Sequence, residues 1–244
     1  QDIANRADRQ RQMEALKEAM KRDDGNLFYA VVVAEELLTD GKRAEAAPLV
    51  ARLAEATHDV RAAGAAARFH CLGDEAAKAV AIVDRFAQSV DPGTPDGLVR
   101  QRQAVEIIDR LARLAVQKKL ACVRQMMDAA FERYRSVTKA NPEAAAAHAA
   151  LLAFDGKPAE AFDLLTAARS QLSPRSLAAA GMGVIRNGNV SPRQFQVVLG
   201  WIEEALAIDP SNLTLRLSLA EMLALKLDYA AAEPIYREVL KAEP

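Results

Sequence analysis

Three histidines and two cysteines are the side chains of this sequence that are best suited to hold a metal ion. The histidines are His58, His70 and His148, and none has a second histidine or a cysteine three or four residues away. His70 adjoins Cys71, but adjacent residues of a helix point about 100° apart and cannot easily share a tetrahedral ion. We therefore expect no metal site, and we interpret the histidines as packed or exposed side chains.

The two cysteines, Cys71 and Cys122, form no CxxC pair and lie in helical segments far apart in the sequence. Disulfide frameworks are typical of short secreted chains with several cysteines. We therefore expect no disulfide framework in this chain.

Motifs for nucleophilic or phosphate chemistry are missing as well. The sequence has no G-x-S-x-G, and Gly181-Met-Gly183 lacks the third glycine and the preceding strand of a dinucleotide site. Adjacent acids such as Glu35-Glu36 and Glu203-Glu204 are typical of solvated helix faces. The sequence therefore predicts a chain that is not an enzyme and that binds no cofactor.

A basic stretch within residues 98–124 is the candidate for nucleic-acid binding. Such binding needs cations on one face and aromatic side chains that stack on unpaired bases. Glu106 and Asp109 interrupt the stretch, no aromatic residue occurs between Leu98 and Ala130, and the formal net charge of the chain is −1. We interpret the stretch as a solvated helix surface and keep RNA binding as an alternative. Its cations are Arg100, Arg102, Arg110, Arg113, Lys118, Lys119 and Arg124.

The composition indicates closely packed helices. Hydrophobic residues make up 51% of the chain but aromatic residues only 5%, and alanine occurs in runs such as Ala65–Ala67 and Ala144–Ala147. Alanine is the best helix former, and its small side chain lets helix axes approach closely. No run of 18 apolar residues is present, so we expect no membrane insertion.

A repeated phrase shows how these helices are organised. Pro210 and Pro244 lie thirty-four residues apart, and they close the phrases Ala-Leu-Ala-Ile-Asp-Pro and Val-Leu-Lys-Ala-Glu-Pro. A helix–turn–helix unit of this length cannot bury its apolar face alone and must stack on its neighbours. The period therefore predicts an α-solenoid.

The units resemble the tetratricopeptide repeat family, in which small residues recur where the first and second helices of a pair cross. In the last unit Ala220 and Ala232 take these places, with a turn at Asp228-Tyr229, and Ala34 takes the equivalent place near the start of the chain. The resemblance implies an all-α, right-handed α-solenoid, and it implies that these alanines are buried. We expect Ile235 or Val239 to form an exposed apolar stripe on the last helix.

The predicted solenoid covers residues 1–244 as a single array and is expected to be a fragment of a longer protein. The segment 93–142 is irregular, because its expected helices, 98–116 and 119–140, are longer than the family standard and lack a clean turn motif. The segments are a half repeat, 1–26, followed by 27–58, 59–92, 93–142, 143–174, 175–210 and 211–244.

The resemblance also implies a function, since the first helices of such pairs line a concave surface that binds protein segments. We expect a non-enzymatic scaffold for a protein or peptide, without a small-molecule substrate. A regulatory or substrate-recruiting array of a larger enzyme is the alternative, and exposed repeat ends would allow self-association. The expected partner-binding residues are Phe28, Val31, Glu35, Ala63, His70, Leu217 and Glu221.

Overall fold

The computed structural model describes residues 2–138, 141–187 and 190–242, and within these ranges every regular element is a helix. Pro244, which closes the second repeated phrase, lies outside them. The helices are α1 (Asp2–Arg22), α2 (Leu27–Thr39), α3 (Arg43–Glu55), α4 (Val60–Leu72), α5 (Ala76–Gln88), α6 (Pro95–Lys118), α7 (Val123–Thr138), α8 (Ala144–Phe154), α9 (Pro158–Ala168), the 3₁₀ helix η1 (Arg169–Gln171), α10 (Pro174–Asn187), α11 (Pro192–Ile208), α12 (Leu213–Leu225) and α13 (Tyr229–Ala242).

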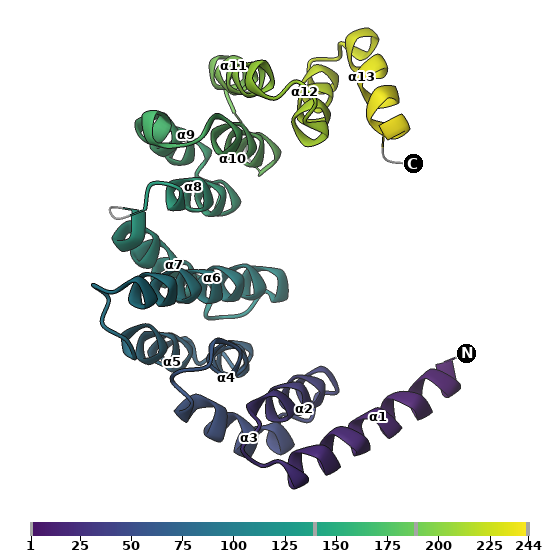
Figure 1. Ribbon diagram of the computed structural model, residues 1–244, viewed down its shortest axis with the longest axis vertical. Helices are drawn as coiled ribbons and strands as arrows, with labels where there is room; N and C mark the ends of the chain where they lie inside the picture. Colours follow the sequence, from purple (N-terminus) through teal and green to yellow (C-terminus); the bar gives the residue numbers. More distant parts are fainter. Residues whose placement is uncertain (1, 139–140, 188–189, 243–244) are drawn as a thin grey trace. The chain divides into compact units, whose positions relative to one another are not determined.

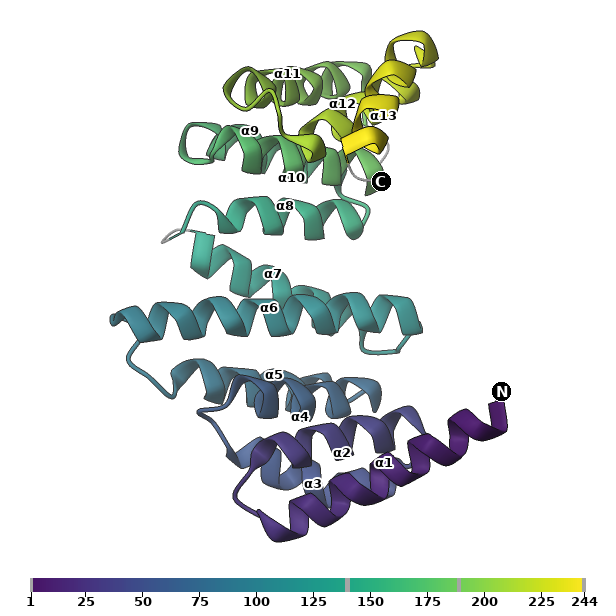
Figure 2. The same cartoon turned by 45° about the vertical axis from the view of Figure 1, so that its right-hand side comes forward.

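The helices form two compact units, Gln1–Arg133 and Tyr134–Pro244. In the first unit α2 packs on α3 and α4 on α5, while α4 also contacts both α2 and α6 (Figure 1). In the second unit α8 packs on α9, α10 on α11 and α12 on α13, while α10 contacts both α8 and α12 (Figure 2). Each unit is therefore a stack of helix pairs, which confirms the fold class expected from the repeat period.

Side chains just before several helices fix where those helices begin. Asn26 accepts a hydrogen bond from the backbone N–H of Phe28, and Asp59 accepts from the N–H groups of Arg61 and Ala62. Such caps satisfy backbone donors that have no partner inside the helix, each typically worth about 1 kcal/mol. Thr94, Ser191 and Asn212 cap α6, α11 and α12 in the same way.

Five helix pairs share one turn, the Schellman motif, in which a left-handed residue ends the first helix. The left-handed residues are Gly41, Asp74, Lys119, Gly156 and Leu227, with φ between 53° and 77°. The residue after each donates its N–H to the carbonyl five residues back, at 2.8–3.0 Å. The motif therefore ends the first helix of all five pairs in the same way.

The middle pair departs from the template in length but not in its turn. Its first helix, α6, has 24 residues, whereas α2, α4 and α12 have 13 each. The expected lack of a regular turn is wrong, because Lys119 has φ 53° and Leu120 donates to the carbonyl of Ala115 at 3.0 Å. The second helix begins at Val123, a few residues later than expected, since this turn occupies the residues before it.

Small residues line the contacts within the pairs. The alanines expected at helix crossings, Ala34, Ala220 and Ala232, are all buried. In the α10/α11 pair the small residue is Gly181, where an added Cβ would lie 2.9 Å from a methyl group of Val198 and 3.0 Å from the Trp201 ring. Larger side chains would hold the helix axes apart and lose the close packing of the core.

A buried histidine is part of the second unit's core. The His148 ring on α8 stacks on Tyr134, with the ring centroids 5.3 Å apart and the planes 4° from parallel. Burial, and secondarily the charge of Arg135, lowers the pKa of His148 to about 4. The imidazole is therefore neutral at neutral pH and is a packing group.

The backbone conformation of the turns leads to a prediction about two glycines of the second unit. An alanine side chain at either Gly156 or Gly200 would meet no atom within 4 Å, but only Gly156 has a positive φ, of 77°. We expect Gly156→Ala to lower the free energy of unfolding by about 1 kcal/mol, since the left-handed region disfavours a Cβ. Gly200→Ala, inside α11, should raise it by about 0.5–1 kcal/mol. Urea unfolding of both variants measures the difference, and equal effects would contradict the turn assignment.

The depressed pKa of His148 predicts a loss of stability in mild acid. Because the unfolded histidine binds its proton near pH 6.5 and the folded one only near pH 4, stability falls as the pH drops through this window. Through this histidine, the free energy of unfolding should fall by about 2–3 kcal/mol between pH 7 and pH 4.5. Urea unfolding followed by circular dichroism should show a smaller loss over this range in His148→Phe, which keeps an aromatic ring on Tyr134. The exposed His58 provides the control, and a His58→Gln variant that changed the pH dependence as much would refute the assignment.

Candidate partner-binding surfaces

The first helices of the first unit present a surface made of side-chain pairs that cross from α2 to α4. The guanidinium of Arg61 lies 5.8 Å from the centre of the Phe28 ring, and Arg68 pairs with Glu35 at 3.5 Å. Phe28 is 46% exposed and Glu35 is half-buried. We call these four residues the α2–α4 surface.

Two of the expected contact residues on the same helices face inward. Val31 and Ala63 are both buried. The structure therefore corrects their predicted role, because neither can touch a partner while α2 and α4 stay packed. Their place is in the core, where a charged substitution would leave an unpaired buried group.

His70 also has a partner within the chain. Its Nδ1 lies 2.9 Å from one carboxylate oxygen of Glu75, and the Arg43 guanidinium contacts the same oxygen at 3.3 Å. Lys78 pairs with the other carboxylate oxygen of Glu75. Lys78, followed by His70, lowers the pKa of Glu75 to about 2. Arg43 also donates to the Phe69 carbonyl at 2.6 Å, and its guanidinium carbon lies 3.8 Å from the centre of the Phe69 ring. Arg43 thus joins α3 to the α4/α5 turn, and His70 is occupied by a contact with Glu75 of its own helix pair.

In the second unit, three residues of α12 share one face at a spacing of four residues. Leu217 is 40% exposed and Leu225 is 54% exposed, while Glu221 between them is half-buried. Arg186 of α10 binds Glu221 through two nitrogens, with Nε at 2.8 Å, which lowers the pKa of Glu221. We call Leu217, Glu221, Leu225 and Arg186 the α12 surface.

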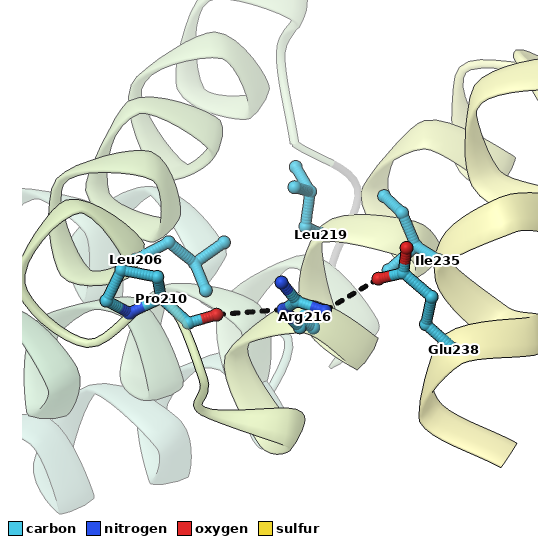
Figure 3. A pocket seen from close by; sticks show the side chains of 6 residues that line it. All are labelled: Leu206, Pro210, Arg216, Leu219, Ile235 and Glu238. Atoms are coloured by element: carbon cyan, nitrogen blue, oxygen red, sulfur yellow. Dashed lines mark hydrogen bonds and ion pairs between the residues drawn. The ribbon is translucent and has the colours of Figure 1, made fainter. Parts of the chain in front are cut away.

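A small pocket lies beside α12, between α11 and α13 (Figure 3). Its volume is about 260 Å³, and Leu206, Leu219 and Ile235 supply apolar walls. Arg216 spans it, donating to the Pro210 carbonyl at 2.8 Å and to Glu238 at 2.6 Å. The pocket is large enough for one apolar side chain but offers no cluster of reactive groups.

The expected exposed stripe on α13 is only partly present. Ile235 and Val239 are both half-buried, and Ile235 lines the pocket beside α12. The apolar side chains that α13 exposes are instead Tyr229 and Leu240, at 62% and 70%. The residues that α13 could offer to another molecule therefore differ from the expected pair.

Several cations of the basic stretch are held by the protein itself. Arg100 donates to the Thr57 carbonyl at 3.2 Å and lies over the Phe86 ring, and Arg113 pairs with Asp109 at 2.8 Å. Arg124 pairs with Asp128. Cations with such partners offer less charge to a phosphate backbone, so these contacts do not favour an RNA surface.

Sequence reasoning missed the cross-helix partners of the predicted residues. Arg61 and Arg68 follow Phe28 and Glu35 at the same interval of one repeat, so the repeat alignment held the signal. It also missed that Cys71 and Cys122 meet, since residues on different pairs share no sequence spacing. Among the described residues no group of three or more His, Cys, Asp or Glu could hold a metal ion. None of the described helices is long and apolar enough to span a membrane.

Comparison with known proteins gives structural neighbours only. No protein-family model and no curated protein matches the chain. A tetratricopeptide repeat protein from Parabacteroides merdae aligns at 14% identity with a TM-score of 0.44, over 100% of this chain and 90% of that one. The human IFIT1 dimer with PPP-AAAA aligns at 14% identity and a TM-score of 0.38, over 93% of this chain, which spans only 57% of the IFIT1 chain. Yeast Tom70 aligns at 11% identity and a TM-score of 0.36, over 94% of this chain and 54% of that one.

The repeated features of the chain itself decide its class. The same Schellman turn recurs in five pairs, small residues lie buried within the pairs, and consecutive first helices pack on one another within each unit. Helix pairs of this kind, stacked in sequence order, give this chain the tetratricopeptide-like helical-repeat fold.

Proposed function

We propose that this protein is a non-catalytic scaffold that binds a helical or extended segment of a partner protein. The observation that carries the proposal is the α12 surface, where Leu217 and Leu225 remain exposed on either side of the Glu221–Arg186 pair. Exposed apolar side chains on one helix face suit an amphipathic segment, which buries its own apolar side chains against them. The ion pair between them would contact polar groups of the same segment.

The α2–α4 surface is a second place for such a contact, in the other unit. Phe28 offers an exposed aromatic ring, and aromatic residues are frequent among the side chains that contribute most to binding. Its neighbours Arg61, Glu35 and Arg68 are charged, so a partner segment here would combine one apolar side chain with charged ones. The two surfaces lie in different units, and each is proposed independently of the other.

If the chain were a regulatory array of a larger enzyme, it would bind its partner through the same two surfaces. The proposal therefore holds for either kind of protein. RNA binding has no comparable support, because Arg100, Arg113 and Arg124 have partners within the chain. The PPP-AAAA ligand belongs to IFIT1, and the basic stretch of this chain supplies no aromatic side chains to stack on bases.

The test selects peptides from a random-sequence display library against the chain and measures their affinities by fluorescence anisotropy. We expect the selected peptides to be amphipathic and to bind Leu217→Asp and Leu225→Asp at least about tenfold more weakly, since losing an apolar anchor typically costs about 2 kcal/mol. Leu240→Asp is the matched control, because it makes the same change at an exposed leucine of α13. Circular dichroism should show unchanged helicity in all three variants.

Two results would count against the proposal. If no peptide is selected, the chain has no segment-binding surface of this kind. If Leu240→Asp abolishes binding while the two α12 variants bind as the parent does, the surface lies on α13. Val31→Asp is unsuitable as a probe, because Val31 is buried and the change would destabilise α2.

A further inference from the structure

Two cysteines that lie far apart in the sequence meet inside the first unit. Cys71 is in the last turn of α4, and Cys122 directly precedes α7. The Cys122 Sγ lies 3.6 Å from the backbone carbonyl oxygen of Cys71, and both side chains are buried. Both are free thiols in the structure.

The turns that end α4 and α6 hold this pair of cysteines in place. The Schellman motif at Lys119 ends α6 and brings Cys122 to the turn that follows α4. There the backbone N–H of Cys122 donates to the carboxylate of Asp74 at 3.1 Å. On the other side, the Cys71 Sγ donates to the carbonyl of Leu111 at 3.7 Å. These contacts hold the backbone of Cys122 against the turn that follows α4 and orient the side chain of Cys71.

We propose that Cys71 and Cys122 are a modification site, at which a small-molecule disulfide such as oxidised glutathione converts the two thiols into an intramolecular disulfide. One cysteine thiolate attacks the glutathione disulfide, forms a mixed disulfide and releases one glutathione thiolate. The second cysteine thiolate then attacks the protein sulfur of that mixed disulfide and releases the other. The two protons lost by the cysteines protonate the two glutathione thiolates, so two protein thiols are oxidised as one glutathione disulfide is reduced.

Burial sets the rate of this exchange. Loss of solvent, with further contributions from Cys122 and Asp74, raises the pKa of Cys71 to about 12, and burial also raises the pKa of Cys122. Because only the thiolate attacks a disulfide, exchange in the folded chain is slow. The disulfide forms during folding, or when the turn before α7 opens, and its burial then protects it from reduction.

The bond would make one junction between neighbouring helix pairs covalent. It would tie the end of α4 to the start of α7 and enclose α5 and α6 in a closed loop. A closed loop restricts the unfolded chain more than the folded one, and so favours the folded state.

The test refolds the whole chain in a series of glutathione buffers of increasing oxidised-to-reduced ratio, with acid quenching. Mass spectrometry counts the chains that have lost two hydrogens and carry no glutathione, and a non-reducing peptide map identifies the linkage. Since the chain has two cysteines, an intramolecular disulfide can only be this one. The same titration in concentrated urea provides the reference. We expect the folded chain to favour the disulfide at least about tenfold more than the unfolded chain.

A disulfide that forms more readily in the folded chain must also stabilise the folded chain. The oxidised chain should therefore unfold at a higher urea concentration than the reduced chain, which gives a second measurement. Cys122→Ser is the control, since its urea midpoint should be the same in oxidising and reducing buffers. Equal disulfide fractions in folded and unfolded chains would overturn the proposal. So would a folded product dominated by glutathione adducts, by intermolecular dimers or by free thiols in buffers that oxidise the unfolded chain.

Discussion

The constraint on which this structure depends is that a pair of short helices cannot bury its apolar faces without neighbours. Helices of 13 residues, such as α2, α4 and α12, gain most of their stability from packing and little from propensity alone. α4 shows the consequence, because Ala62, Ala63, Ala65, Ala66 and Ala67 are all buried among α2, α5 and α6. A helix covered from several sides has room only for small side chains, which accounts for a chain rich in alanine and poor in aromatic residues.

Much of this architecture could be predicted from sequence because it rests on residue types that recur. Small residues at crossings recur with the repeat, so the burial of Ala34 and Ala220 followed from their place in it. The turns were harder to predict, since Asp74, Lys119 and Leu227 adopt a conformation usually associated with glycine. Backbone hydrogen bonds on both sides of the turn impose this left-handed conformation, and they do not depend on the residue type.

The candidate surfaces could be predicted only in part. Exposure on a helix changes from one residue to the next, so a small shift in the orientation of α2 decides that Phe28 is exposed and Val31 buried. The partners of a charged residue lie one repeat away, as for Glu35 with Arg68 and Glu221 with Arg186. Such pairs satisfy charges that would otherwise be open to solvent, and they leave the exposed apolar side chains as the distinctive feature of each surface.

The chain's one tryptophan gives the two units different optical properties. Trp201 is buried in the second unit, with its ring stacked on Phe162 at 5.5 Å between centroids. Its fluorescence emission therefore reports the solvent exposure of that unit alone, whereas the amide ellipticity sums the helices of both. Coincidence of the two signals during denaturation is a standard criterion for a single cooperative transition. This protein thus carries an intrinsic spectroscopic probe of whether its halves melt together or in succession.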